Sequence, residues 1–301
     1  MTFWKAEINI NKRITQEFSA YKLYISSSKK SSLDRRFSEV HPTTIELYQS
    51  QSQLRKENVL VPEVFCKDLV RIGTVGDGGK WVCNPIRMRN FETCTVYSLG
   101  INNEPSFEES FANFTHQNCF IRSFDKDNQI SKTVKRIENS NGIFMKALIS
   151  SETDKSIDRY SLKSLMEIFN DKRIDILKID IEGFEYQITD ELTSTPICQI
   201  LIEIHGATPT RTFELLYKIS QSGYYLFSYE INGAHHALSE YSFIHESCLE
   251  DYGVNTVFGK YLSLLYYLDQ LDNFFIVTFH ANELLSCLLI ACLIRMNNLT
   301  N

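Results

Sequence analysis

The stretch that most constrains the fold of this chain is residues 174–185, which read IDILKIDIEGFE. Residues 174–179 are rich in β-branched side chains and too few for an independent helix, so they predict a buried strand. Asp180, Glu182 and Glu185 follow that strand, around Gly183. Ligands of open α/β sheets bind outside the carboxyl ends of the strands. Acids at this position therefore indicate either a solvent-exposed turn or a ligand site.

The surrounding sequence predicts an α/β fold, because strand and helix patterns alternate from residue 94 onward. Such alternation is typical of a parallel sheet with right-handed crossovers. The last two strands follow one another directly and predict an antiparallel pair. Strands are predicted over residues 94–99, 119–124, 143–149, 174–179, 198–204, 224–231 and 240–245, and helices over 105–116, 128–138, 161–169 and 212–220.

Composition limits the class of protein. The chain has 301 residues, of which 43% are hydrophobic and 23% charged, as in ordinary globular proteins. The formal charge of -6 disfavours a nucleic-acid partner, since a nucleic-acid footprint usually shows as a clustered basic excess. We expect an N-terminal extension over 1–58, partly flexible, a main domain over 59–261 and an apolar helical tail over 262–301.

Neither end of the chain predicts a membrane segment. The most apolar run, residues 284–294, is shorter than the roughly 20 apolar residues that span a bilayer. The first residues lack the apolar core of a signal peptide, which favours the cytoplasm but leaves the compartment open.

The eight cysteines include no C-x-x-C pair, which disfavours a zinc ribbon or a thioredoxin-type motif. Cys94, Cys119 and Cys198 lie in or beside apolar runs, so we expect them to be small buried hydrophobic residues. Cys66 and Cys83 flank a glycine-rich turn and would pair only in an oxidising compartment.

That glycine-rich turn, residues 76–79 (GDGG), lies between two short β-type runs and predicts a hairpin. In a tight turn without a ligand, Asp77 and Lys80 would be solvated. The residues themselves leave open whether the turn also contacts a ligand.

The first strand of the alternating pattern ends in Gly100, before a polar loop and a helix. Glycine lets a backbone approach a ligand closely, and a helix N-terminus offers free N–H groups. One glycine is present where a dinucleotide site needs three, which disfavours NAD and FAD and leaves room for a smaller adenosyl ligand. Asp125 ends the second strand, where doubly wound folds place an acid on ribose hydroxyls. The alternative is a solvated acid.

Because strand ends meet at one edge of a sheet, Gly100, Asp125, Asp180, Glu182 and His205 are expected to line one polar pocket. Carboxylates with a histidine can hold a divalent cation. The certain ligands are too few for a coordination argument, so we assign no metal site.

These residues resemble a known family. Residues 178–185 (KIDIEGFE) are similar to the K-I-D-x-E-G-x-E signature of FkbM-type methyltransferase domains. Residues 71–83, 97–104 and 240–245 resemble the methyltransferase-like protein 24 type, in its nematode form. The resemblance covers about residues 60–260 in matching order.

The resemblance implies a class I, Rossmann-like methyltransferase fold with a mostly parallel seven-stranded sheet whose last strand is antiparallel. It implies S-adenosyl-L-methionine as cofactor, with the loop of Gly100, Asn102 and Asn103 near its methionine part, Asp125 on its ribose, and Asp180 between cofactor and acceptor. The chain departs from the wider class at residues 100–102, where Gly-Ile-Asn replaces the usual second glycine.

We therefore expect O-methylation of a small-molecule or glycan hydroxyl. A base must remove the hydroxyl proton, and His205 is the first candidate, with Glu182 second. One alternative is a catalytically inactive Rossmann-like binding module, which the thinned glycine loop suggests. Another is an NAD-dependent oxidoreductase, which the missing glycines oppose.

Overall fold

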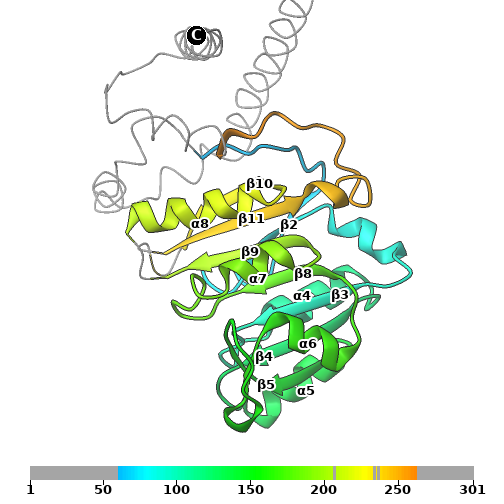
Figure 1. Cartoon of the computed structure of the whole chain (residues 1–301). Helices are drawn as coiled ribbons and strands as arrows, with labels where there is room; N and C mark the ends of the chain where they lie inside the picture. The colour runs from blue at the N-terminus through cyan, green and yellow to red at the C-terminus, as the bar shows by residue number, and fades with distance from the viewer. Residues whose placement is uncertain (1–59, 206–207, 233–234, 236–237, 263–301) are drawn as a thin grey trace, which may run out of the picture. The chain divides into compact units, whose positions relative to one another are not determined.

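A seven-stranded sheet forms the centre of the computed structural model, which describes residues 60–205, 208–232, 235 and 238–262 (Figure 1). The strand order is β10-β11-β9-β8-β3-β4-β5. Strand β11 runs in the direction opposite to the other six strands. This confirms the predicted mostly parallel sheet with an antiparallel last strand. The strands are β3 (Thr95–Leu99), β4 (Phe120–Asp125), β5 (Gly142–Lys146), β8 (Ile174–Ile179), β9 (Ile197–Ile204), β10 (Tyr224–Ile231) and β11 (Ser239–His245).

Helices connect the strands, and the four predicted helices are present with shifted ends. Ser161 caps α6, because its hydroxyl accepts from the Ser164 N–H at 3.2 Å. The sequence pattern missed α7, which has only six residues. The α-helices are α4 (Ser106–Phe114), α5 (Ser131–Asn139), α6 (Leu162–Phe169), α7 (Thr189–Ser194) and α8 (Pro209–Gln221), and the 3-10 turns are η2 (Pro85–Asn90), η3 (Lys155–Ile157) and η4 (Glu246–Cys248).

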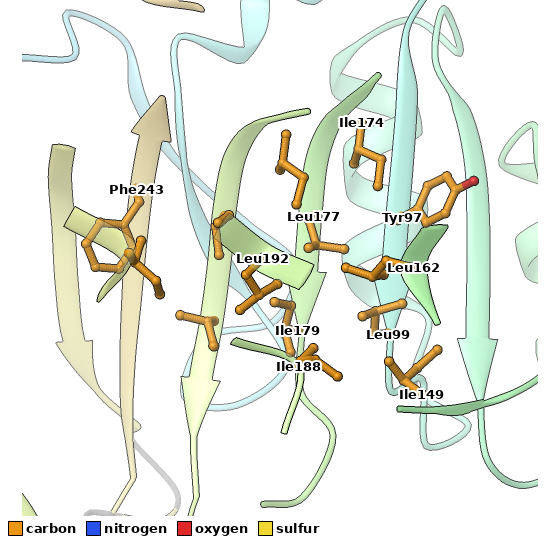
Figure 2. Close-up of a cluster of buried hydrophobic side chains, with 14 of the residues drawn as sticks. Tyr97, Leu99, Ile149, Leu162, Ile174, Leu177, Ile179, Ile188, Leu192 and Phe243 are labelled. Carbon is orange, nitrogen blue, oxygen red and sulfur yellow. The ribbon is translucent and has the colours of Figure 1, made fainter. Parts of the chain in front are cut away.

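Each face of the sheet has its own apolar cluster, because successive side chains of a strand point to opposite faces. On β3, Tyr97 and Leu99 join the cluster that α6, α7 and α8 cover, whereas Val96 joins the cluster that α4 covers. Figure 2 shows the first of these clusters, with Leu162 of α6 and Leu192 of α7 packed against the strands. Strands β8 and β9 are buried along their whole length. Packing on both faces of the sheet therefore fixes the positions of their ends.

The predicted hairpin is present and lies outside the main sheet. Strand β1 (Leu69–Ile72) pairs antiparallel with β2 (Lys80–Cys83). Two hydrogen bonds of 2.9 Å join the side chain of Gln199 on β9 to the backbone of Cys83. The hairpin is thereby attached to the central sheet, whereas Asp77 in its turn is exposed.

One predicted strand is interrupted. Residues 143–149 were expected to form a single strand, but β5 ends at Lys146. A separate two-stranded sheet then forms from β6 (Leu148–Ile149) and β7 (Arg159–Tyr160). Ala147 between them donates its N–H to the carbonyl of Asp125 at 2.7 Å, which turns the chain away from the sheet at the end of β4.

Three disulfides link the described part of the chain: Cys66–Cys83, Cys94–Cys119 and Cys198–Cys248. The possible Cys66–Cys83 pair is therefore formed. Cys94, Cys119 and Cys198 are buried, as expected, but the expectation of free thiols is wrong. Each sits opposite a second cysteine brought there by the fold, which sequence spacing does not reveal.

The predicted extension 1–58 and the predicted tail 262–301, apart from residue 262, lie outside the described residues, so the domain division stays a prediction. None of the helices within the described ranges has the length and apolar character that crossing a membrane requires.

We predict that reduction will lower the thermal stability of the protein strongly. Closing loops with sequence separations of 17, 25 and 50 residues stabilises by about 3 to 4 kcal/mol each in the chain-entropy model. Peptide mapping without reductant should recover the three pairs, and the melting temperature should fall on reduction. Free thiols at all six positions in protein secreted from eukaryotic cells would contradict the assignment.

Candidate functional site

The candidate site lies at the carboxyl ends of β9, β8, β3 and β4, which are four consecutive strands of the central sheet. Every residue predicted for the pocket follows or ends one of these strands. The loops carry Gly100, Asp125, Asp180, Glu182 and His205, as the rule for open sheets leads one to expect.

Gly100 and Asp180 are in backbone contact. Gly100 has φ +83°, and a Cβ at this position would lie 1.7 Å from the Asp180 carbonyl oxygen. The Asp180 N–H donates to the Leu99 carbonyl at 3.0 Å, and the Lys178 ammonium donates to the Gly100 carbonyl at 2.6 Å. Any other residue than glycine would push the loop after β3 away from the end of β8. The glycine is thus required to bring the two loops together.

Asp125 anchors the loop that follows Gly100. Its Oδ2 accepts the N–H groups of Ile101 and Asn102, both at 2.9 Å, and its Oδ1 accepts the Asp127 N–H at 2.9 Å. The residue is 8% exposed, so the alternative of a solvated acid is wrong. The carboxylate holds the glycine loop against the end of β4, a structural task that the sequence did not reveal.

Asn102 and Asn103 both adopt left-handed backbone conformations, with φ +44° and +59°. Asparagine tolerates this region better than most residues. The side-chain oxygen of Asn103 accepts the Ile130 N–H at 2.8 Å. The backbone N–H of Asn103 donates to the side-chain oxygen of Gln129 at 2.5 Å. Consecutive turned residues keep the loop short and exposed between the ends of β3 and β4.

The acidic turn after β8 is tight. Glu182 and Gly183 both have positive φ, and the Glu182 side chain is 62% exposed. Glu185 is fully buried, and its Oε1 accepts the N–H groups of Ile181 and Gly183 at 3.2 Å. Glu185 lies ahead of α7, which begins at Thr189. Its carboxylate holds the turn closed from inside.

His205 completes the cluster from the end of β9. Its Nδ1 lies 3.1 Å from Glu185 Oε1. An ionised carboxylate can only accept, so Nδ1 carries the proton. Nε2 therefore faces the other two acids, at 3.7 Å from Asp180 Oδ1 and 3.6 Å from Glu182 Oε2. Asp180, Glu182 and His205 thus lie together, as expected of residues at these strand ends, and Glu185, which was not among the predicted pocket residues, joins them.

The acids also determine the proton affinity of His205. Burial lowers the pKa of its imidazole, but the hydrogen bond and the charge of Glu185, with the charges of Asp180 and Glu203, raise it to about 9. At neutral pH the ring then carries a proton. A protonated imidazole cannot take another proton, so the expected role as a base is poorly matched to His205 by itself.

A buried charge cluster that sequence reasoning missed lies beside the acidic turn. Lys80 is 1% exposed, and its ammonium lies 2.9 Å from Glu203 and 3.0 Å from Glu240. Asn232 donates to Glu203 at 2.8 Å and to Asp77 at 3.1 Å. The alternative in which Lys80 is a solvated turn residue is therefore wrong. Glu203, the acid of a strand whose other polar residue is Gln199, lies two residues before His205 and was the signal in the sequence.

We predict that nuclear magnetic resonance titration of His205 will give a pKa near 9, well above the ordinary 6.5. Because the folded pKa is raised, the stabilisation is complete below pH 6.5 and is lost as pH rises through 9. Glu185→Gln should lower the pKa, whereas Asp158→Asn, an exposed acid elsewhere, should not. A pKa at or below 6.5 in the wild-type protein would contradict this geometry.

Comparison with known proteins supplies the family. No curated protein has significant similarity to the chain. The solved structure of a fibrillarin pre-rRNA processing protein from Methanococcus jannaschii matches with 11% identity and a TM-score of 0.36, over 62% of this chain and 86% of that one. A family model described as a methyltransferase domain matches residues 20–245. This range includes the whole seven-stranded sheet and the whole candidate site, and the chain therefore belongs to that methyltransferase domain family.

Proposed function

We propose that the protein is an S-adenosyl-L-methionine-dependent methyltransferase of the FkbM type, close to the methyltransferase-like protein 24 branch. Its acceptor in this proposal is a hydroxyl group of a small molecule or glycan. The observation that carries the proposal is the backbone contact of Gly100 with Asp180. It joins a side-chain-free loop to an acidic turn at the carboxyl edge of the sheet.

The residues at that edge fit the cofactor. Gly100 presents backbone without a side chain, and the left-handed pair Asn102 and Asn103 shapes the loop beside it. Asp125 is the acid at the end of β4, where ribose hydroxyls are bound in doubly wound folds. Each carboxylate oxygen has two lone pairs, so Oδ1, which accepts the Asp127 N–H, retains capacity for a hydroxyl.

When bound, S-adenosylmethionine supplies an electrophilic methyl group on a cationic sulfonium. The acids at the site suit that charge, because preorganised charges act strongly where water is excluded. Asp180, between the glycine loop and His205, borders both the cofactor and the acceptor in this arrangement. The main task of the chain is to align the acceptor oxygen with the methyl group.

A proton must also leave the acceptor hydroxyl during or after transfer. Glu182, with its side chain 62% exposed and 3.6 Å from His205 Nε2, is the better proton acceptor of the two candidates. His205, whose pKa is raised to about 9, holds a proton at pH 7 and acts as a donor to Glu182 or to the acceptor. The order of the two candidates is thereby reversed from the sequence-based expectation.

The disulfides bear on the compartment. Disulfides form and persist in oxidising environments and are rare in the cytosol. Three of them in the described part of the chain favour an oxidising compartment over the cytoplasm.

The second candidate function is a Rossmann-like binding module without turnover. The observation that favours it is the glycine loop, in which Asn102 and Asn103 follow Gly100 and a second glycine is missing. Cofactor binding separates the two candidates, since a module that has lost turnover need not retain the cofactor.

We predict that isothermal titration will detect S-adenosylmethionine binding to the wild-type protein. Asp125→Asn should weaken it by about tenfold to a hundredfold, the value of one hydrogen bond to a charged group. Gly100→Ala should abolish binding, because its Cβ collides with Asp180.

Gly76→Ala is the matched control for the glycine, since Gly76 has φ +100° but no atom within 4 Å of a Cβ. It should bind the cofactor like the wild type. A folded wild-type protein that gives no binding at millimolar S-adenosylmethionine would exclude the proposal and favour the binding module.

A further inference from the structure

We infer that Asp180, Glu182 and His205 form a binding site for one divalent first-row metal ion, with Glu185 as the residue that orients the histidine. The ligand atoms are Oδ1 of Asp180, Oε2 of Glu182 and Nε2 of His205. In the metal-free protein Nε2 carries a proton at neutral pH, and the ion displaces that proton when it binds. No two of the three ligand atoms are more than 4.8 Å apart. Both acids come from the turn after β8 and the histidine from the end of β9, so rigid elements position all three.

The distances suit an ion better than direct hydrogen bonds. Nε2 lies 3.6 Å and 3.7 Å from the two carboxylate oxygens, beyond the 2.7–3.2 Å of an N–H···O hydrogen bond. Bonds of about 2.1 Å to one ion place neighbouring ligand atoms about 3 Å apart. The three groups thus converge with space between them, and small side-chain movements close them on an ion.

Glu185 provides the independent observation. Its side chain is fully buried, and Oε1 lies 3.1 Å from His205 Nδ1. Its Oε2 is buried and has no hydrogen-bond partner among the described residues. A carboxylate that holds the remote nitrogen of a histidine, and so directs the lone pair of the other nitrogen, is typical of metal-binding histidines.

The surrounding charge also favours a cation. Three carboxylates surround one imidazole in this cluster. The nearby Lys80 is paired with Glu203 and Glu240, and Lys178 donates to the Gly100 carbonyl. The lysines are therefore engaged elsewhere, and a cation at the cluster neutralises acids that otherwise repel one another.

One imidazole nitrogen with two carboxylate oxygens is a mixed ligand set. Carboxylates and water suit Mn²⁺ and Mg²⁺, whereas imidazole suits first-row transition ions. Mn²⁺ satisfies both preferences, and we expect it to bind more tightly than Mg²⁺ or Ca²⁺. Water, or the acceptor oxygen, would complete the coordination on the exposed side, where Glu182 meets solvent.

The use of the ion in methyl transfer rests on the proposed function, whereas ion binding itself does not. A bound divalent ion lowers the pKa of an oxygen ligand and fixes its position. An acceptor hydroxyl held there would lose its proton more readily beside Asp180. This arrangement removes the need for His205 to act as a base.

The test is a titration of the full disulfide-bonded chain with Mn²⁺, without cofactor or acceptor. Binding is measured as the loss of the electron paramagnetic resonance signal of free Mn²⁺. Glu182→Gln removes an exposed ligand with little risk to folding and should abolish one bound ion. Glu185→Gln should weaken binding by about tenfold to a hundredfold, the usual effect of losing an orienting partner.

Asp158→Asn is the matched control. Asp158, like Glu182, is an exposed acid with a left-handed backbone, φ +53° against +58°. Its ion pair with Lys146 lies away from the cluster. This variant should bind Mn²⁺ like the wild type. Pulsed electron paramagnetic resonance should also show coupling between Mn²⁺ and the imidazole nitrogen of His205. This coupling should disappear in His205→Gln.

Absence of Mn²⁺ binding at millimolar concentration would overturn the inference, and so would binding that Glu182→Gln and Asp180→Asn leave unchanged. Since S-adenosylmethionine binding is measured separately, a protein that binds the cofactor but not Mn²⁺ would refute the metal site alone. One that binds Mn²⁺ but no cofactor would refute the proposed function alone.

Discussion

The contact of the Gly100 backbone with the Asp180 carbonyl is the constraint on which the candidate site depends. A Cβ on residue 100 would lie 1.7 Å from that oxygen, so the ends of β3 and β8 can meet only because the residue is glycine. Asp125 then holds the glycine loop from the β4 side through the N–H groups of Ile101 and Asn102. The backbone surface offered to a cofactor and the acids that follow β8 are therefore parts of one rigid unit.

Buried charge is the second organising feature. Lys80 joins the hairpin to Glu203 and Glu240 of the central sheet, and Glu185 joins the acidic turn to His205. Burying ionised groups is costly unless they are paired and hydrogen-bonded, and such groups seldom add net stability compared with apolar packing. Clusters of this kind are common where function requires perturbed charges. Both clusters lie at one edge of the sheet, the edge at which we propose the functional site.

Much of this arrangement was predictable from local patterns, and the rest depends on contacts between distant residues. The strand and helix periodicity predicted the seven-stranded sheet, and the rule for strand ends brought Gly100, Asp180 and His205 together. The sequence pattern indicated that Cys94 and Cys119 are buried hydrophobic residues. It did not reveal their disulfide, because pairing depends on which strands lie side by side and not on sequence spacing. Lys80 pairs with a glutamate 123 residues away, so its burial had no local signal. The partner of Lys80, Glu203, was visible in the sequence as an acid within a mostly apolar strand.

The most direct test of the account is a crystal structure with S-adenosylhomocysteine and Mn²⁺, with anomalous data collected at the manganese edge. The account predicts cofactor density against Gly100, with its ribose at Asp125. It also predicts one anomalous peak between Asp180, Glu182 and His205. Cofactor bound away from the Gly100 loop, or a structure at saturating Mn²⁺ without a peak in the acidic cluster, would contradict it.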